Sequence, residues 1–138
     1  MQILLVRGFD QWIFRGMDIL GDELEKLGHI AVVSAPLGAM WDTRDYDVLI
    51  GNSQGAVVVM NRPVILNKNP KMIITVDVPT YPDWKAHNGV KHLNIYGTWH
   101  KAGRIKGAKN IFIGLNHLML SYSEDMRQKV KEFIKNNA

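Results

Sequence analysis

A turn bracketed by two glycines, set between two apolar runs, constrains the fold of this 138-residue chain more than any other feature. In the stretch DVLIGNSQGAVVVM, the turn GNSQG spans residues 51–55. A strand that enters a helix through so short a turn needs small residues at both of its ends. The order predicts a strand, a strained turn and a helix, with the hydroxyl of Ser53 presented where they meet. A tight strand-to-helix connection without chemistry is the alternative interpretation.

The remaining apolar runs are continuous rather than alternating, which is typical of strands buried on both faces of a parallel sheet. Strands and helices alternate in the first half of the sequence, as they do in βαβ units. The later connections are short, with loops where helices would be expected. We therefore expect a three-layer α/β fold of about six mostly parallel strands, in a single domain over residues 1–138 without a lid domain. The strands are expected at residues 2–6, 29–35, 46–51, 71–78, 91–97 and 110–114.

The helices are less sharply defined than the strands. An amphipathic pattern over residues 17–28 predicts a first helix, and a helix that opens after the glycine turn is expected to end or kink at Pro63. Residues 37–45 are expected to form a loop. Ser121 and Glu124 have the spacing of a capping box, which predicts the start of a closing helix. The buried face of this helix is expected to hold Met126, Val130, Phe133 and Ile134.

Composition excludes several classes of protein. Hydrophobic residues make up 46% of the chain and charged residues 22%, as in ordinary globular proteins, and no cysteine is present for disulfides or thiolate metal sites. The net charge of +4 comes from scattered basic residues, which favours a solvated basic face over a nucleic-acid partner. No apolar stretch is long enough to span a membrane, and no signal peptide is visible, so a cytoplasmic location is expected.

Two kinds of ligand site are not expected from the sequence. The histidines and carboxylates show no clustered ligand spacing, so neither a metal nor a cofactor is predicted. The turn GNSQG lacks the glycine pattern that cradles phosphates, and no Walker A lysine is present. A nucleotide-binding flavodoxin-like domain is therefore the weaker of the possible interpretations.

A serine nucleophile needs a base, and His117 is the best candidate among the five histidines. It follows the last expected strand and precedes the closing helix, at the sheet end where a base could face Ser53. A histidine bonded only to nearby backbone is the alternative. His100 follows the fifth expected strand and should lie on the same rim. The other histidines, which are expected at the surface, are His29, His87 and His92.

With these residues in view, the chain resembles the α/β-hydrolases, and most of all the small lidless bacterial lipases and esterases. The stretch LLVRGFD matches their first strand and oxyanion loop, GDELEKLGH their first helix, and DVLIGNSQGA their nucleophile turn. The C-terminal stretch from NIYGTWH to KVKEFI matches their last two strands, histidine loop and closing helix in order, spacing and side-chain character. Residues 60–90 match poorly.

The resemblance implies a serine hydrolase that cleaves carboxylic esters or thioesters through an acyl-enzyme on Ser53, with His117 as the base. It places the two backbone N–H donors of the oxyanion hole at Phe9 and Gln54, where they would stabilise charge that develops only in the transition state. Small or accessible acyl substrates are expected, while the oligomeric state is left open. The tryptophans, which could line an acyl pocket or pack in the core, are Trp12, Trp41, Trp84 and Trp99.

Two positions depart from the pattern that the resemblance implies. The family's acid, after the penultimate strand, falls on or next to His100, which cannot serve as a carboxylate. Asp77, at the end of the fourth strand, is the best substitute and Asp83 the second, although Asp77 could also be a turn-capping residue. Arg7 stands where the family usually has histidine. These departures favour a second hypothesis, in which the chain is a non-catalytic binding or structural module on a degenerate hydrolase fold.

Overall fold

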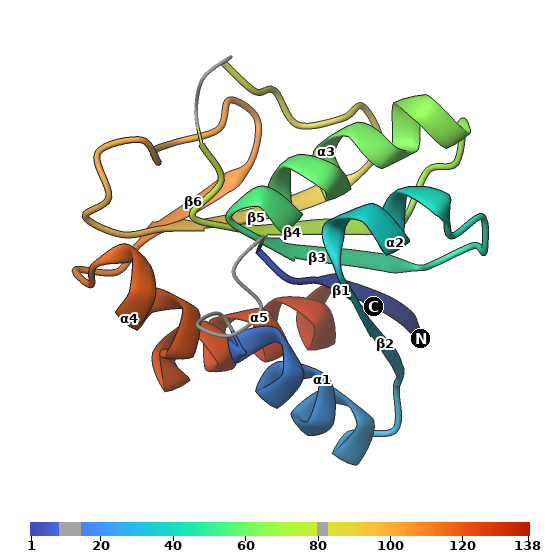
Figure 1. Cartoon of the computed structure of the whole chain (residues 1–138), viewed down its shortest axis with the longest axis horizontal. Helices are drawn as coiled ribbons and strands as arrows, with labels where there is room; N and C mark the ends of the chain where they lie inside the picture. Colours follow the sequence, from blue (N-terminus) through green and yellow to red (C-terminus); the bar gives the residue numbers. More distant parts are fainter. Residues whose placement is uncertain (9–14, 80–82) are drawn as a thin grey trace.

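The computed structural model describes residues 1–8, 15–79 and 83–138, and within them a six-stranded parallel sheet lies between two layers of helices (Figure 1). The expected three-layer α/β fold is confirmed, and all the strand pairs are parallel. The strands are β1 (Gln2–Val6), β2 (Ile30–Ser34), β3 (Val48–Asn52), β4 (Met72–Val76), β5 (Lys91–Tyr96) and β6 (Lys109–Phe112). The helices are α1 (Gly16–Lys26), α2 (Pro36–Trp41), α3 (Gln54–Leu66), α4 (His117–Tyr122) and α5 (Glu124–Asn137).

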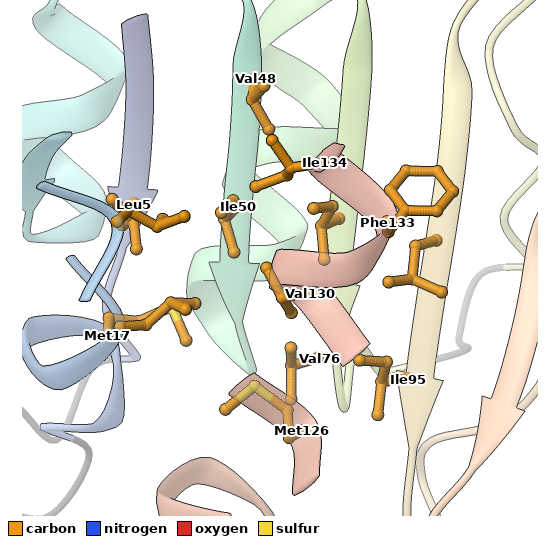
Figure 2. Packing of buried hydrophobic residues seen from close by; sticks show 14 of the residues in the cluster. Leu5, Met17, Val48, Ile50, Val76, Ile95, Met126, Val130, Phe133 and Ile134 are labelled. Atoms are coloured by element: carbon orange, nitrogen blue, oxygen red, sulfur yellow. The ribbon is translucent and has the colours of Figure 1, made fainter. Parts of the chain in front are cut away.

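The two faces of the sheet are covered by different helices. Helices α1 and α5 lie on one face, and α2 and α3 lie on the other (Figure 1). Because neighbouring residues of a strand point to opposite faces, Ile50 joins the core under α1 and α5, whereas Leu49 joins the core under α3. Figure 2 shows α5 lying over the strands with its apolar side chains turned toward them. The expected buried residues of this helix are confirmed, and they are Met126, Val130, Phe133 and Ile134.

The strand order β2-β1-β3-β4-β5-β6 fixes where a ligand site can lie. The chain goes from β1 outward to β2, returns to place β3 on the other side of β1, and then continues outward to β6. The connections that leave β1 and β3 therefore diverge to opposite faces of the sheet. In folds of this topology, ligands bind at the carboxyl ends of the two strands where the connections diverge, and here Val6 is paired with Gly51 at these ends. Ser53 follows β3 at this point of the sheet.

The helix boundaries correct two expectations from the sequence. Residues 36–41 form α2, where a loop was expected over 37–45, because Pro36 stands at the first helical position and its fixed φ suits a helix start. Pro63 does not end α3, which continues to Leu66. A proline removes only one backbone N–H, and this one lies in the last turns of the helix, so the remaining hydrogen bonds carry the helix a few residues further.

The closing helix begins differently from the capping-box expectation. Its N-cap is Ser123, whose Oγ accepts a hydrogen bond from the Met126 N–H at 3.1 Å. Ser121 instead lies inside α4, where its hydroxyl donates to the carbonyl oxygen of Leu118. The spacing of Ser121 and Glu124 was therefore misleading, because a residue that is already helical cannot adopt the extended conformation of an N-cap.

His92 is also placed differently from its expected surface position. It lies in β5 with 4% of its surface exposed, and its Nε2 is 2.9 Å from the Thr75 hydroxyl. The same hydroxyl donates to the side-chain oxygen of Asn94 at 2.9 Å. Burial lowers the pKa of His92 to about 4, with a further contribution from the nearby His87.

The described parts of the connections around β5, residues 83–90 and 97–108, contain no helix.

None of the described helices combines the length and the apolar character that crossing a membrane requires.

Candidate active site

The glycine turn places Ser53 between the end of β3 and the start of α3. Its backbone adopts φ 57° and ψ −117°, a conformation that is strained for any residue with a side chain. A Cβ atom on Gly51 would lie 2.3 Å from the Gly55 carbonyl oxygen, and a Cβ on Gly55 would lie 2.1 Å from the Val6 carbonyl oxygen. Both glycines are therefore required by close backbone contacts, which hold the serine in its strained conformation.

The imidazole of His117 faces the serine. His117 is the first residue of α4, and the side chain of Asn116 caps this helix by accepting a hydrogen bond from the Met119 N–H at 2.8 Å. The Nε2 atom of His117 lies 3.0 Å from the Oγ atom of Ser53, although the two residues are 64 positions apart in the sequence. At this distance the ring can take the proton of the hydroxyl directly.

Asp77 approaches the other nitrogen of the same ring. Its Oδ2 atom lies 2.7 Å from His117 Nδ1, and its Oδ1 atom accepts a hydrogen bond from the Gly97 N–H at 2.9 Å. The carboxylate is fully buried, and the residue has a φ of 51° directly after β4. A buried carboxylate in this position orients the ring, with Nδ1–H donated to Asp77 and Nε2 left to accept from Ser53.

The two expected oxyanion donors differ in what the structure shows. Gln54 is the first residue of α3, so its N–H belongs to the first turn, whose N–H groups have no partner within the helix. The positive end of the helix dipole lies at the same point and favours negative charge there. Phe9 falls outside the described residues. Asp83, the second candidate for the acid, is exposed, and so is His100, which occupies the position of the family's acid.

Arg7, the residue after β1, forms an ion pair with Asp18. Its Nε atom donates to Asp18 Oδ2 at 3.0 Å, and its Nη2 atom pairs with Oδ1 of the same carboxylate. This hydrogen bond raises the pKa of Arg7, while partial burial acts in the opposite direction. The ion pair fastens the end of β1 to the first turn of α1.

The tryptophans take different positions. Trp41 is 78% exposed on α2, and Trp84 donates its indole N–H to the Pro79 carbonyl oxygen at 2.7 Å. The ring of Trp99 lies against that of His117 in a tilted contact, and Trp12 falls outside the described residues. Sequence reasoning missed the contributions of Gly97 and Trp99. The sequence GTW, residues 97–99, could have indicated them, because it stands at the end of the fifth strand, next to the position of the family's acid.

Within the described ranges, no three histidine or acidic side chains are grouped so that they could hold a metal ion. The sequence matches no protein-family model and no curated protein.

Solved structures, by contrast, are similar over nearly the whole chain. A thioesterase domain from the curacin biosynthetic pathway superposes with a TM-score of 0.64 at 12% identity, covering 96% of this chain and 90% of that domain. A structure from a study of LipS and LipT, two metagenome-derived lipolytic enzymes, gives a TM-score of 0.63 at 10% identity, covering 97% of this chain and 93% of the other. Together with the strand order and the serine turn after β3, these similarities identify the fold of this protein as that of the α/β-hydrolases.

Proposed function

We propose that this protein is a serine hydrolase that cleaves carboxylic esters or thioesters through an acyl-enzyme on Ser53. The observation that carries the proposal is a continuous line of contacts, 3.0 Å from Ser53 Oγ to His117 Nε2 and 2.7 Å from His117 Nδ1 to Asp77 Oδ2. The three side chains come from the ends of β3 and β4 and from the start of α4. A serine, a base and an orienting carboxylate in this order are the parts that acyl transfer requires.

The first half of the reaction forms the acyl-enzyme. His117 Nε2 takes the proton of the Ser53 hydroxyl while Oγ attacks the carbonyl carbon of the substrate. The carbonyl oxygen becomes an oxyanion, which the Gln54 N–H would stabilise from the first turn of α3. The tetrahedral intermediate then breaks its bond to the leaving alcohol or thiol, which receives the proton from His117. Asp77 accepts the Nδ1–H bond throughout and stabilises the transient imidazolium.

The second half returns the enzyme to its starting state. His117 takes a proton from a water molecule, whose oxygen attacks the acyl carbon. The second tetrahedral intermediate breaks its bond to Ser53 Oγ, which regains its proton from His117. The products are a carboxylic acid and the free serine. The helix start at Gln54 serves both halves, because each passes through an oxyanion at the same carbonyl oxygen.

The similar structures support the same class of substrate. One is named as a thioesterase domain and the other comes from a study of lipolytic enzymes, which fits hydrolysis at an acyl carbon. For this chain we propose small-molecule or acyl esters and thioesters. The alternative, a non-catalytic module on a degenerate fold, is not favoured, because a buried carboxylate aligned on a histidine is costly to keep without a function that uses it.

Labelling with a fluorophosphonate probe, combined with hydrolysis assays, tests the proposal. The wild-type protein should be labelled, and it should hydrolyse p-nitrophenyl butyrate or a short-chain acyl thioester whose free thiol is measured with a thiol-reactive dye. Ser53→Ala should abolish labelling and lower kcat at least about 10³-fold, because it removes the nucleophile.

Ser34→Ala is the matched control. Ser34 ends β2, and its hydroxyl donates to the neighbouring Ala35 carbonyl oxygen, so its loss should leave labelling and kcat unchanged. Equal labelling of wild type and Ser53→Ala would contradict the proposal, as would a folded wild-type protein without activity on both substrate classes and without labelling.

A further inference from the structure

The segment that follows β5 touches both partners of Ser53. The Gly97 N–H donates to Asp77 Oδ1 at 2.9 Å, and a Cβ on Gly97 would lie 2.2 Å from the Leu115 carbonyl oxygen. The Thr98 N–H donates to that same Leu115 oxygen at 2.9 Å, two residues before His117. Residues 97 and 98 are therefore fixed by hydrogen bonds to the loop that carries the base and to the acid itself.

The indole of Trp99 extends from this fixed segment over the imidazole of His117. The two ring centroids are 4.1 Å apart, with 37° between the ring planes. The backbone around Trp99 is held on its other side as well, because its carbonyl oxygen accepts from the Ala102 N–H at 3.0 Å and Ala102 bridges to Pro79. The indole thus has a defined position against the ring that faces Ser53.

Among the described residues, Trp99 is not part of a hydrophobic cluster. Its side chain is half-buried and lies outside the three clusters that these residues form. The indole N–H of Trp84, by comparison, donates to backbone, and that ring packs against two of the clusters. Within the part of the chain that the structure describes, the aromatic ring against Trp99 is that of His117.

We infer that Trp99 is a positioning residue for the proposed reaction, and that its indole keeps the His117 ring aligned between Asp77 and Ser53. The inference rests on the function proposed above. Rotation about the last bond of a histidine side chain is otherwise broad, so two hydrogen bonds alone leave the ring free to tilt. The indole of Trp99, 4.1 Å away, obstructs tilting of the imidazole toward it. The imidazole therefore keeps the orientation in which its two nitrogens face Asp77 and Ser53.

The same contact favours the transition state over the ground state. His117 becomes positively charged only while it holds the proton of Ser53, and the face of an indole attracts a cation. The attraction is therefore strongest when the barrier is crossed, and it acts on kcat rather than on substrate binding. Phenylalanine would keep a flat ring with a weaker attraction, whereas leucine would keep apolar volume without a flat face.

Kinetics of three variants test the inference. Trp99→Leu should lower kcat about tenfold or more with KM changed less than about twofold, and Trp99→Phe should stay within about threefold of wild type. Trp41→Leu is the control, because Trp41 is 78% exposed on α2, and it should leave both constants unchanged. Equal kcat for wild type and Trp99→Leu would overturn the inference. A rise in KM with an unchanged kcat would overturn it as well.

Nuclear magnetic resonance of the histidine rings gives a readout that needs no activity. In the wild type, the ring protons of His117, assigned by their loss in His117→Gln, should be shifted upfield by the indole. The Nδ1 proton held by Asp77 should appear as a slowly exchanging downfield signal. Trp99→Leu should remove the upfield shift and broaden the downfield signal, while Trp99→Phe should keep the downfield signal sharp.

The two measurements separate this inference from the proposed function. A change of both signals in Trp99→Leu, in a protein that hydrolyses no ester or thioester, would support positioning and contradict the hydrolase. Unchanged signals in an active enzyme would overturn the positioning role and leave the hydrolase intact. Should Trp99→Leu fail to fold, the wild-type upfield shift still decides, because its absence would mean that the two rings are not in contact.

Discussion

The carboxylate of Asp77 accepts a hydrogen bond from the ring of His117, which lies forty residues further along the chain. Asp77 follows β4, whereas the resemblance to small lipases placed the acid after β5. Because β4 and β5 are adjacent parallel strands, their carboxyl ends open onto the same rim, and a carboxylate from either can reach the same ring. The segment after β5 contributes Gly97 and Trp99 to the site instead of an acid.

The first prediction concerns this displaced acid. Asp77→Asn should lower kcat on a short-chain ester roughly 10²- to 10⁴-fold, because an amide neither holds the Nδ1–H tautomer reliably nor stabilises the imidazolium. Steady-state kinetics measures the change. His100→Ala serves as the comparison, since His100 is exposed, and its effect should stay below about twofold. Equal and small effects of the two substitutions would leave a Ser–His dyad as the better description.

The strain at Ser53 gives the second prediction. Ser53→Gly should be more stable than Ser53→Ala by about 1 kcal/mol, because both variants lose the hydroxyl but only alanine keeps a Cβ at a φ of 57°. Urea unfolding of the two purified variants measures the difference. Alanine proving the more stable of the pair would show that the backbone at this position is not strained.

The third prediction concerns the close contact of the turn with β1. Gly55→Ala should destabilise the fold by roughly 3 kcal/mol or more, because its Cβ would lie 2.1 Å from the Val6 carbonyl oxygen. Gly28→Ala is the matched control, since Gly28 has a φ of 93° but open space around its Cβ position, and it should cost only about 1–2 kcal/mol. Similar losses for the two variants in urea unfolding would mean that β1 and α3 are less tightly apposed than the contact implies.

The fourth prediction follows from the buried histidine of β5. Burial lowers the pKa of His92 from 6.5 to about 4, so the unfolded chain binds the proton more readily than the folded one. Stability from this group is therefore fully present above about pH 6.5 and is lost as the pH falls toward 4. The loss amounts to about 3 kcal/mol at pH 4 as an order of magnitude.

Unfolding by urea at pH 7 and pH 4 checks this difference. His92→Gln should lose less stability than the wild type between the two values, because glutamine can still bond to the Thr75 hydroxyl but does not titrate. His100→Gln, at an exposed position, should follow the wild type. A wild-type profile that matches that of His92→Gln would contradict the buried, neutral state of His92.

Much of the fold follows from short-range patterns. Continuous apolar runs predicted the six strands and their parallel arrangement, because only strands covered on both faces dispense with polar alternation. The helix after the glycine turn and the buried face of α5 were also predicted correctly. Boundaries that depend on one residue's backbone conformation were missed, as with α2 after Pro36 and the N-cap at Ser123 rather than Ser121.

The sequence by itself determined the turn at Ser53, because two glycines around a serine between two apolar runs form the local pattern of a strand, a strained turn and a helix. It also singled out His117 through the order of strand, loop and helix. It named Asp77 as the best substitute for the family's acid and Asp83 as the second, and only the tertiary structure decided between them and showed which other groups surround the ring. Asp77, Gly97 and Trp99 come together because adjacent parallel strands end on one rim, and which of several side chains on that rim meets the histidine depends on strand register and loop contacts that no local pattern encodes.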